Sequence, residues 1–204
     1  MATAIEQGRQ TRTRLMSAAV ELIVERGWGA VTTRMVADRA GVRPGVVHYH
    51  FASVTDLLIQ SALQLARTEY DAVMAQLSDV DGPEGMRRLL TAIGSFAATD
   101  PAMVAMSEMM LAATRHEPLR NELGRFVSEA RAQLTEWFRT RSAIGDPQAT
   151  AAVVLALIDG LILHRLIDPT LGAVDVTGPL LRAAGLTDNE GTTHVRENES
   201  PRGD

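Results

Sequence analysis

The chain has 204 residues, of which 46% are hydrophobic and 22% charged, and a net charge of −5, a composition that fits one globular domain or two small ones. It contains neither cysteine nor lysine, which excludes disulfides, thiolate nucleophiles, cysteine-ligated metals and Schiff-base catalysis. Its longest apolar run, residues 151–158, is too short to cross a bilayer, and residues 1–10 lack the apolar stretch of a secretory signal, so we expect a cytoplasmic protein without membrane contact.

Helical periodicity begins near the start of the chain. Apolar residues recur at three- and four-residue steps from Thr11 until Gly27, which predicts a first helix. After a short connector, Thr32 can cap a second helix of about two turns. Pro44 can open a third helix that runs to about Phe51, because a proline at the first helical position loses no hydrogen bond.

The rest of the chain is also predicted to be helical. A long fourth helix starts after an N-cap at Ser53 and continues toward Leu77. Pro- and Gly-containing turns separate five further predicted helices, at about residues 84–98, 101–114, 119–141, 147–166 and 174–184. No segment alternates with period two for long enough to predict a strand, and residues 187–204 are polar enough to predict disorder. The predicted fold class is all-α, with about nine helices.

Charge is distributed unevenly between the short helices and the long ones. Residues 1–50 carry seven arginines and four acids, a net charge of +3, whereas residues 51–204 carry thirteen arginines and twenty-one acids, a net charge of −8. A cationic segment before an acidic body is typical of a nucleic-acid reader with a second domain. Ordinary scatter of charges along a chain is the alternative explanation.

Three runs of residues carry a resemblance to a known family. The first three helices have the dimensions of a helix-turn-helix, and their sequences are VTTRMVADRAGV at 31–42, GVVHYHF at 45–51 and DLL at 56–58. Together they closely resemble the DNA-binding domain of the tetracycline-repressor (TetR) family over about residues 11–60. The resemblance implies a DNA-binding domain at 1–53 and a helical effector-binding and dimerisation domain at 54–186, with a disordered tail at 187–204.

The resemblance also implies which residues contact DNA. Arg34 is expected to reach a guanine in the major groove, where its guanidinium fork can donate to O6 and N7, and Thr33 is expected to bind a phosphate. Gly45 lacks a side chain, so the backbone of the third helix can approach the groove closely. The candidate DNA-binding residues are Arg12, Arg14, Thr33, Arg34, Arg43, Pro44, Gly45, Val46, His48, Tyr49 and His50.

The eighth predicted helix indicates a dimer. Residues 149–166 are apolar on almost every side, so a helix there must be covered by the core on one side and by something else on the other. We expect a homodimer through residues 147–166 and 174–184, which would place two recognition helices about one DNA turn apart, ~34–36 Å, on a palindromic operator. A core helix of a monomer is the alternative.

Methionines are concentrated in the sixth predicted helix and suggest a pocket. Flexible thioethers conform to irregular apolar ligands, so we expect a small, mainly hydrophobic effector there, with core filling as the alternative role. For His164, a hydrogen-bonded position in the interior or at an interface is the alternative to a contact with the ligand. The candidate ligand-binding residues are Phe96, Met103, Met106, Met110, Phe126, Trp137 and His164.

The sequence therefore predicts a DNA-binding transcriptional regulator, most simply a repressor that an effector releases from its operator. We expect no metal, because His48 and His50 lie two apart on a helix and point to different sides. No phosphate-binding glycine loop, zinc-protease helix or nucleophile elbow is present, so we expect no cofactor and no catalytic site. An all-helical enzyme and a protein-interaction adaptor without DNA are the alternatives.

Overall fold

The computed structural model describes residues 3–77, 80, 82–94, 100–142 and 145–186, and within these ranges it is all-α, as predicted. The elements in the described ranges are α1 Ala4–Arg26, η1 Trp28–Ala30, α2 Thr33–Arg39, α3 Pro44–His50, α4 Val54–Leu77, α5 Gly82–Gly94, α6 Pro101–Ala113, α7 Glu117–Arg141, α8 Pro147–Ile167, η2 Pro169–Ala173 and α9 Thr177–Ala183.

Side-chain caps explain where the helices begin. The Thr32 hydroxyl accepts from the Met35 amide at 3.3 Å and starts α2. At α4, Ser53 Oγ accepts from the Asp56 amide at 3.0 Å, while the Asp56 carboxylate accepts from the Ala52 amide at 3.1 Å. This reciprocal arrangement fixes the point at which the chain leaves α3 and enters the long helix.

Several predicted boundaries were wrong. Helix α1 starts at Ala4 instead of Thr11, because the Thr3 side chain caps it by accepting from the Glu6 amide, and its first turns carry no apolar stripe that would reveal it. The last helix starts at Thr177 instead of residue 174, since η2 precedes it and its Asp168 cap accepts from the Thr170 amide at 3.0 Å. Residues 95–98 of the predicted fifth helix and the predicted disordered tail lie outside the described residues.

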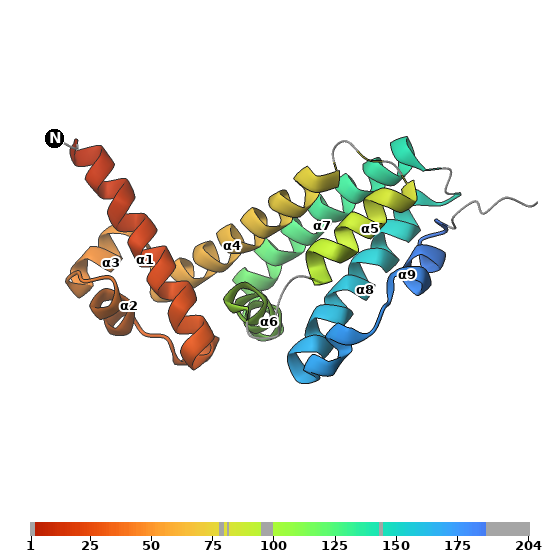
Figure 1. Cartoon of the computed structure of the whole chain (residues 1–204). Coiled ribbons are helices and arrows are strands. Elements are labelled where there is room, and N and C mark those ends of the chain that lie inside the picture. Colours follow the sequence, from red (N-terminus) through yellow and green to blue (C-terminus); the bar gives the residue numbers. More distant parts are fainter. Residues whose placement is uncertain (1–2, 78–79, 81, 95–99, 143–144, 187–204) are drawn as a thin grey trace, which may run out of the picture.

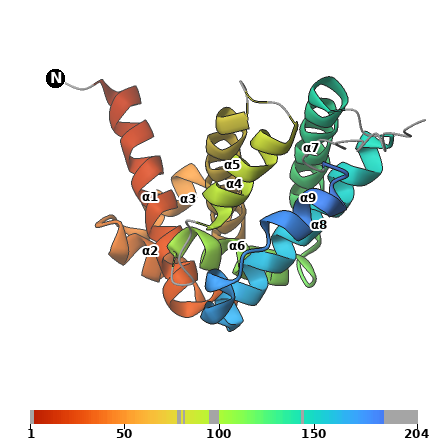
Figure 2. The ribbon, with the colours of Figure 1, turned by 45° about the vertical axis from the view of Figure 1, so that its right-hand side comes forward.

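The helices form two parts joined by α4. Helices α1 to α3, here called the head, lie at one end of the molecule, and α4 runs from the head into the layered helices of the body, α4 to α9 (Figure 1). In the body, α7 packs against α8, and α9 lies beside α8 and α5 (Figure 2). Helix α4 therefore belongs to both parts and can transmit movement between them.

The hydrophobic core does not divide at the predicted boundary between residues 53 and 54. One cluster of buried side chains runs from the head into α6 and the first half of α7, and it includes Leu15, Val47, Met109 and Phe126. A second cluster fills the far end of the body around Leu77, Trp137 and Leu180. The head is thus packed on the body through shared apolar contacts.

Helix α8 is apolar on both its inner and outer sides. Its inner side is buried at Ala151, Val154 and Ile158, while Val153, Leu163 and other large apolar side chains on its outer side are exposed. By length and composition alone, with a mean hydropathy of 1.9 over 18 residues, this helix could cross a membrane. That finding differs from the expectation drawn from the shorter run 151–158, because apolar residues continue on both sides of Asp159 as far as Leu163.

Candidate functional site

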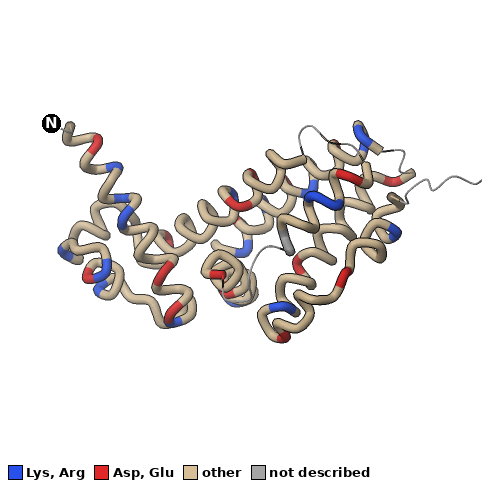
Figure 3. The backbone as a smooth tube through the Cα atoms, in the orientation of Figure 1, with Lys and Arg blue, Asp and Glu red and all other residues tan. Residues whose placement is uncertain are grey.

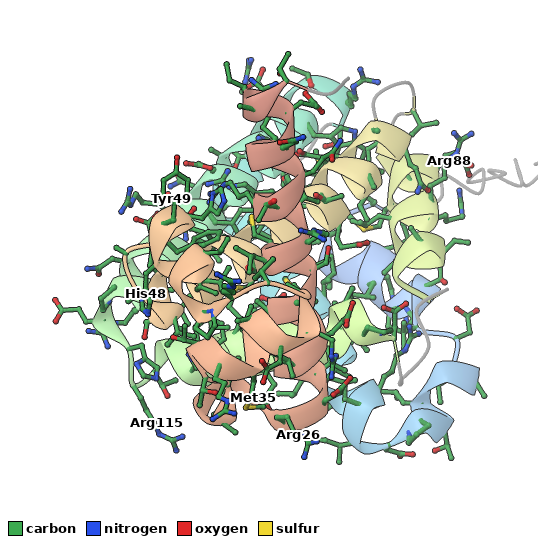
Figure 4. All side chains as sticks on the ribbon, turned by 90° about the vertical axis from the view of Figure 1, so that its left-hand side faces the viewer. Arg26, Met35, His48, Tyr49, Arg88 and Arg115 are labelled. Atoms are coloured by element: carbon green, nitrogen blue, oxygen red, sulfur yellow. The ribbon has the colours of Figure 1, made fainter. Side chains whose placement is uncertain are left out.

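The outer face of α3 is open to solvent. Gly45 is exposed, and a Cβ built on it would meet no atom within 4 Å. Tyr49 is 84% exposed, and in Figure 4 it stands out from α3 with His48 on the side away from α1. The opposite side of the helix carries Val47, which is fully buried. The sequence thus folds α3 with one side in the core and the predicted contact side available to a duplex.

Helix α2 presents Arg34 next to this face. The Arg34 side chain is 87% exposed, and among the described residues it pairs with Asp38, at 3.9 Å one turn away. An exposed pair of this kind is worth at most about 1 kcal/mol, so the guanidinium can leave Asp38 for a base edge. Thr33 is half-buried at the first position of α2, where helix amides point outward and favour a phosphate.

The turn before α3 and the remaining α3 residues complete the surface. Arg43 and Pro44 are exposed at the start of the helix, and Val46 is half-buried beside them. His50 is half-buried and packs edge-to-face against Tyr49, with ring centroids 5.0 Å apart. The tyrosine ring is therefore oriented by its neighbour while its hydroxyl remains free to reach a phosphate or base.

Figure 3 marks where the arginines of the head lie along the backbone, and their side chains differ in how free they are. Arg14 is exposed, as the prediction of a phosphate contact requires. Arg12 is not free: its guanidinium lies over the Phe51 ring, 4.4 Å from the centroid, and donates to Gln60. The structure therefore gives Arg12 the role of joining α1 to α4, and the predicted phosphate contact has no support in this geometry.

Arg39 is also engaged within the head. It donates to Glu25 at 2.7 Å and to Glu21 at 2.9 Å, and its hydrogen bond to Glu25 lowers the pKa of the Glu25 carboxyl. The pairing fastens α2 to α1. Of the arginines predicted to contact DNA, Arg14, Arg34 and Arg43 thus remain exposed.

The body contains a cavity of about 140 Å³ between α4, α6, α7 and α8. A wider outer pocket of about 490 Å³ adjoins it between α6 and α8. The two share lining residues from α6 and α8, namely Met103, Met106, Met110, Asp159 and Ile162. This arrangement offers an apolar chamber with an entrance, the usual form of a small-molecule site.

Four of the predicted ligand-binding residues line this cavity: Met103, Met106, Met110 and Phe126. Trp137 does not, because its indole is buried in the far cluster, where Nε1 donates to the Leu77 carbonyl at 3.1 Å. His164 does not either, because it is exposed on the outer side of α8. Phe96 lies outside the described residues.

Sequence reasoning missed the contributions of α4 and α8 to the cavity. Tyr70 donates to the Ala130 carbonyl at 2.9 Å, and its ring meets Phe126 edge-to-face at 5.8 Å. Burial, together with Asp71, raises the pKa of Tyr70 to about 12. Asp159 had a visible signal, since it is the acid that interrupts the apolar run of α8. Glu69 had none, because it resembles any other solvent-facing acid of a long helix.

Helix α6 connects the cavity to the head. Glu108, on its outer-pocket side, accepts a hydrogen bond from the Trp28 amide at 2.9 Å. Met109, on the same helix, is fully buried in the cluster shared with the head. A change in the position of α6 would therefore act directly on the end of α1.

Comparisons with known proteins agree with this arrangement. Residues 15–60 match the family model for bacterial regulatory proteins of the tetR family, and residues 81–187 match the model for the tetracyclin repressor-like C-terminal domain. An uncharacterized HTH-type transcriptional regulator of Mycobacterium tuberculosis is 27% identical over 91% of this chain and 100% of its own length. The HTH-type transcriptional regulator BetI of Escherichia coli is 30% identical over 75% of this chain and 80% of its own.

A solved structure extends the likeness to the fold of the whole molecule. The multidrug binding protein EbrR, complexed with ethidium, is 25% identical and superposes with a TM-score of 0.68 over 85% of this chain and 97% of its own. The matches cover both the head and the body. The chain belongs to the tetracycline-repressor family of helix-turn-helix transcriptional regulators.

Proposed function

We propose that this regulator is a repressor that binds a palindromic operator as a homodimer and is released by a small effector. The observation that carries the proposal is the outer face of α3, which exposes Gly45 and Tyr49 and is covered by no described part of the chain. A helix with this face fits the major groove of B-DNA, where base pairs present distinct donors, acceptors and methyl groups.

The contacts divide into those that read sequence and those that position the protein. Arg34 donates to a guanine, and Val46 touches a thymine methyl. The helix N-terminus at Pro44 and Gly45 approaches the groove. The remaining contacts hold phosphates, and they come from Arg14, Thr33, Arg43, His48, Tyr49 and His50. These phosphate contacts make binding depend on salt concentration but carry no sequence information.

The exposed outer side of α8 supports a homodimer. Large apolar side chains lie exposed there, among them Val153, Leu157, Leu163 and Ile167. A contiguous apolar surface of this kind is typical of an interface between protein subunits. A second copy of α8, flanked by α9, covers it in our proposal, and the two heads then face one side of the duplex.

Release follows from a shift between two arrangements of the heads. EbrR holds ethidium, which supports a small-molecule effector in the body cavity of this chain. An effector that binds better when α6 is displaced also displaces the end of α1, through the bond between Glu108 and Trp28. Its effect on operator affinity cannot exceed the ratio of its own affinities for the two arrangements.

We assign residues 1–53 to DNA binding and residues 54–186 to effector binding and dimerisation, with the shared core around Met109 joining the two. Because its ligand is chromosomal DNA, the protein works in the bacterial cytoplasm. No catalytic step is part of the proposal.

Selection from a pool of randomised duplexes, followed by fluorescence-anisotropy titration of the selected DNA, tests this function. We expect an enriched palindrome and a loss of affinity of at least about tenfold for Arg34→Ala. The matched control is Arg125→Ala, which removes an exposed arginine paired with Glu122 on α7. Failure to enrich any motif, or equal losses for both variants, would contradict the proposal.

A further inference from the structure

The ionisable residues of the cavity are all of one sign. Among the described residues that line the two pockets, the side chains charged at neutral pH are Glu69, Glu108 and Asp159, and none is an arginine or a histidine. Glu108 is engaged by the Trp28 amide. The other two carboxylates give the chamber a negative potential that no lining cation offsets.

Among the described residues, Asp159 has no partner. Within the described part of the chain, no hydrogen bond or ion pair reaches its carboxylate, whereas Leu155, Ile158 and Ile162 of the same helix line the cavity beside it. Asp159 is exposed to solvent, yet the apolar side chains around it remove part of its water and raise the pKa of its carboxyl to about 6. Water still reaches the residue through the outer pocket. An unpaired carboxylate that lines both pockets and is reached by water is available to a positively charged ligand.

The walls of the chamber suit a cation as well as they suit an apolar body. Met103, Met106 and Met110 supply polarisable thioethers, and Tyr70 and Phe126 supply aromatic rings whose faces attract positive charge. Phe126 already has one such contact, since the Arg67 guanidinium lies 5.5 Å from its centroid. That arginine does not line the cavity, and it pairs with Glu129 at 2.8 Å.

We propose that the cavity binds a lipophilic organic cation, whose charged centre pairs with Asp159 at the junction of the two pockets and whose apolar part lies among the methionines and aromatic rings. Glu69 provides a second carboxylate deeper along α4. The inference rests on the proposed function, because it names the chemical class of the effector. Anionic effectors are rejected, since they would face unpaired carboxylates in a low-dielectric chamber.

Isothermal titration calorimetry with three compounds of similar size tests the charge preference. The probes are benzyltrimethylammonium, its uncharged carbon isostere neopentylbenzene, and the anion phenylacetate. We expect the cation to bind at least about tenfold more tightly than the isostere, and the anion not to bind. Equal or tighter binding of either competitor, or no binding of the cation up to about 10 mM, would overturn the proposal.

Asp159→Asn tests the assigned residue. The amide keeps the shape of the side chain and removes the charge, so the variant should fold, which thermal melting by circular dichroism checks. We expect it to lose at least about tenfold in affinity for the cation and nothing for the isostere. Asp71→Asn is the matched control, because Asp71 is an exposed acid near Tyr70 that does not line the cavity. Equal losses of cation affinity in the two variants would mean that the carboxylates act only by long-range attraction, and would overturn the proposed contact between Asp159 and the cation.

Operator binding separates this proposal from the function on which it rests. A protein that binds its selected DNA and ignores the cation would refute the inference and leave the regulator intact. A protein that binds the cation through Asp159 but enriches no DNA sequence would support the inference and refute the proposed function.

Discussion

Replacing Gly45 by alanine should affect folding stability and operator affinity in opposite directions. Gly45 is the second residue of α3, its backbone is not in the positive-φ region, and an added Cβ would meet nothing within 4 Å. The fold therefore gives no reason for a glycine at this position. Alanine stabilises a helix interior by roughly 0.5–1 kcal/mol relative to glycine, and a smaller gain is expected this close to the N-terminus.

The same methyl group should harm operator binding. It projects from the open side of α3 into the space that the DNA backbone or base edges occupy in our account. We expect the affinity for the selected operator to fall at least about tenfold, which corresponds to ~1.4 kcal/mol. Fluorescence anisotropy gives the affinity, and urea denaturation gives the free energy of unfolding.

Gly124→Ala is the matched control for this variant. Gly124 is an exposed glycine within α7, and its added Cβ also meets nothing within 4 Å. We expect it to gain stability and keep full operator affinity. If Gly45→Ala bound the operator as tightly as the parent protein, the N-terminal end of α3 would not approach DNA closely, and the reasoning would be refuted.

Three further predictions address the body. Glu108→Ala should keep operator affinity but weaken release by benzyltrimethylammonium, measured as the cation concentration at half-release divided by the dissociation constant of the cation. Glu108→Gln retains an acceptor for the Trp28 amide and should release the operator normally. Equal behaviour of the two variants would contradict the coupling between α6 and the head. Gly85→Ala should lower the free energy of unfolding by about 1–3 kcal/mol in urea denaturation, because its Cβ would lie 2.3 Å from Trp137 Cζ2, and an unchanged midpoint would disprove that close approach. Because the pKa of Asp159 is raised to about 6, its carboxyl is mostly protonated below that pH, so the calorimetric affinity for the cation should fall as pH decreases from 7.5 to 5. Asp159→Asn should show no such fall, and parallel profiles of the two proteins would contradict the assignment to Asp159.

Local signals were enough to predict the helices of the head. The caps at Thr32 and Ser53, the proline at the start of α3 and the three-to-four-residue spacing of apolar residues all act within a few positions of one another. The first turns of α1 escaped prediction because Ala4 to Gln10 extend the helix back to the Thr3 cap without an apolar face of their own.

The parts of the site that were missed depend on contacts between distant segments. The sequence pattern predicts that Arg12 is exposed and free. In the structure its guanidinium contacts the Phe51 ring and donates to Gln60, residues that lie far from it along the chain. Trp137 was expected at the ligand and is held elsewhere, since the Leu77 carbonyl lies 60 residues away along the chain. The role of Asp159 depends on α6 packing beside α8 to form the two pockets, which no periodicity in α8 reveals.

Guanine methylation interference on the selected operator tests most directly whether α3 lies in the major groove. The method scores which guanines lose protein binding when N7, a major-groove atom, carries a methyl group. We predict two patches of interference on one face of the duplex, about one helical turn apart, and loss of a guanine signal from each patch in Arg34→Ala. Binding that tolerates methylation at every guanine of a guanine-containing operator, or a pattern unchanged in Arg34→Ala, would contradict the account.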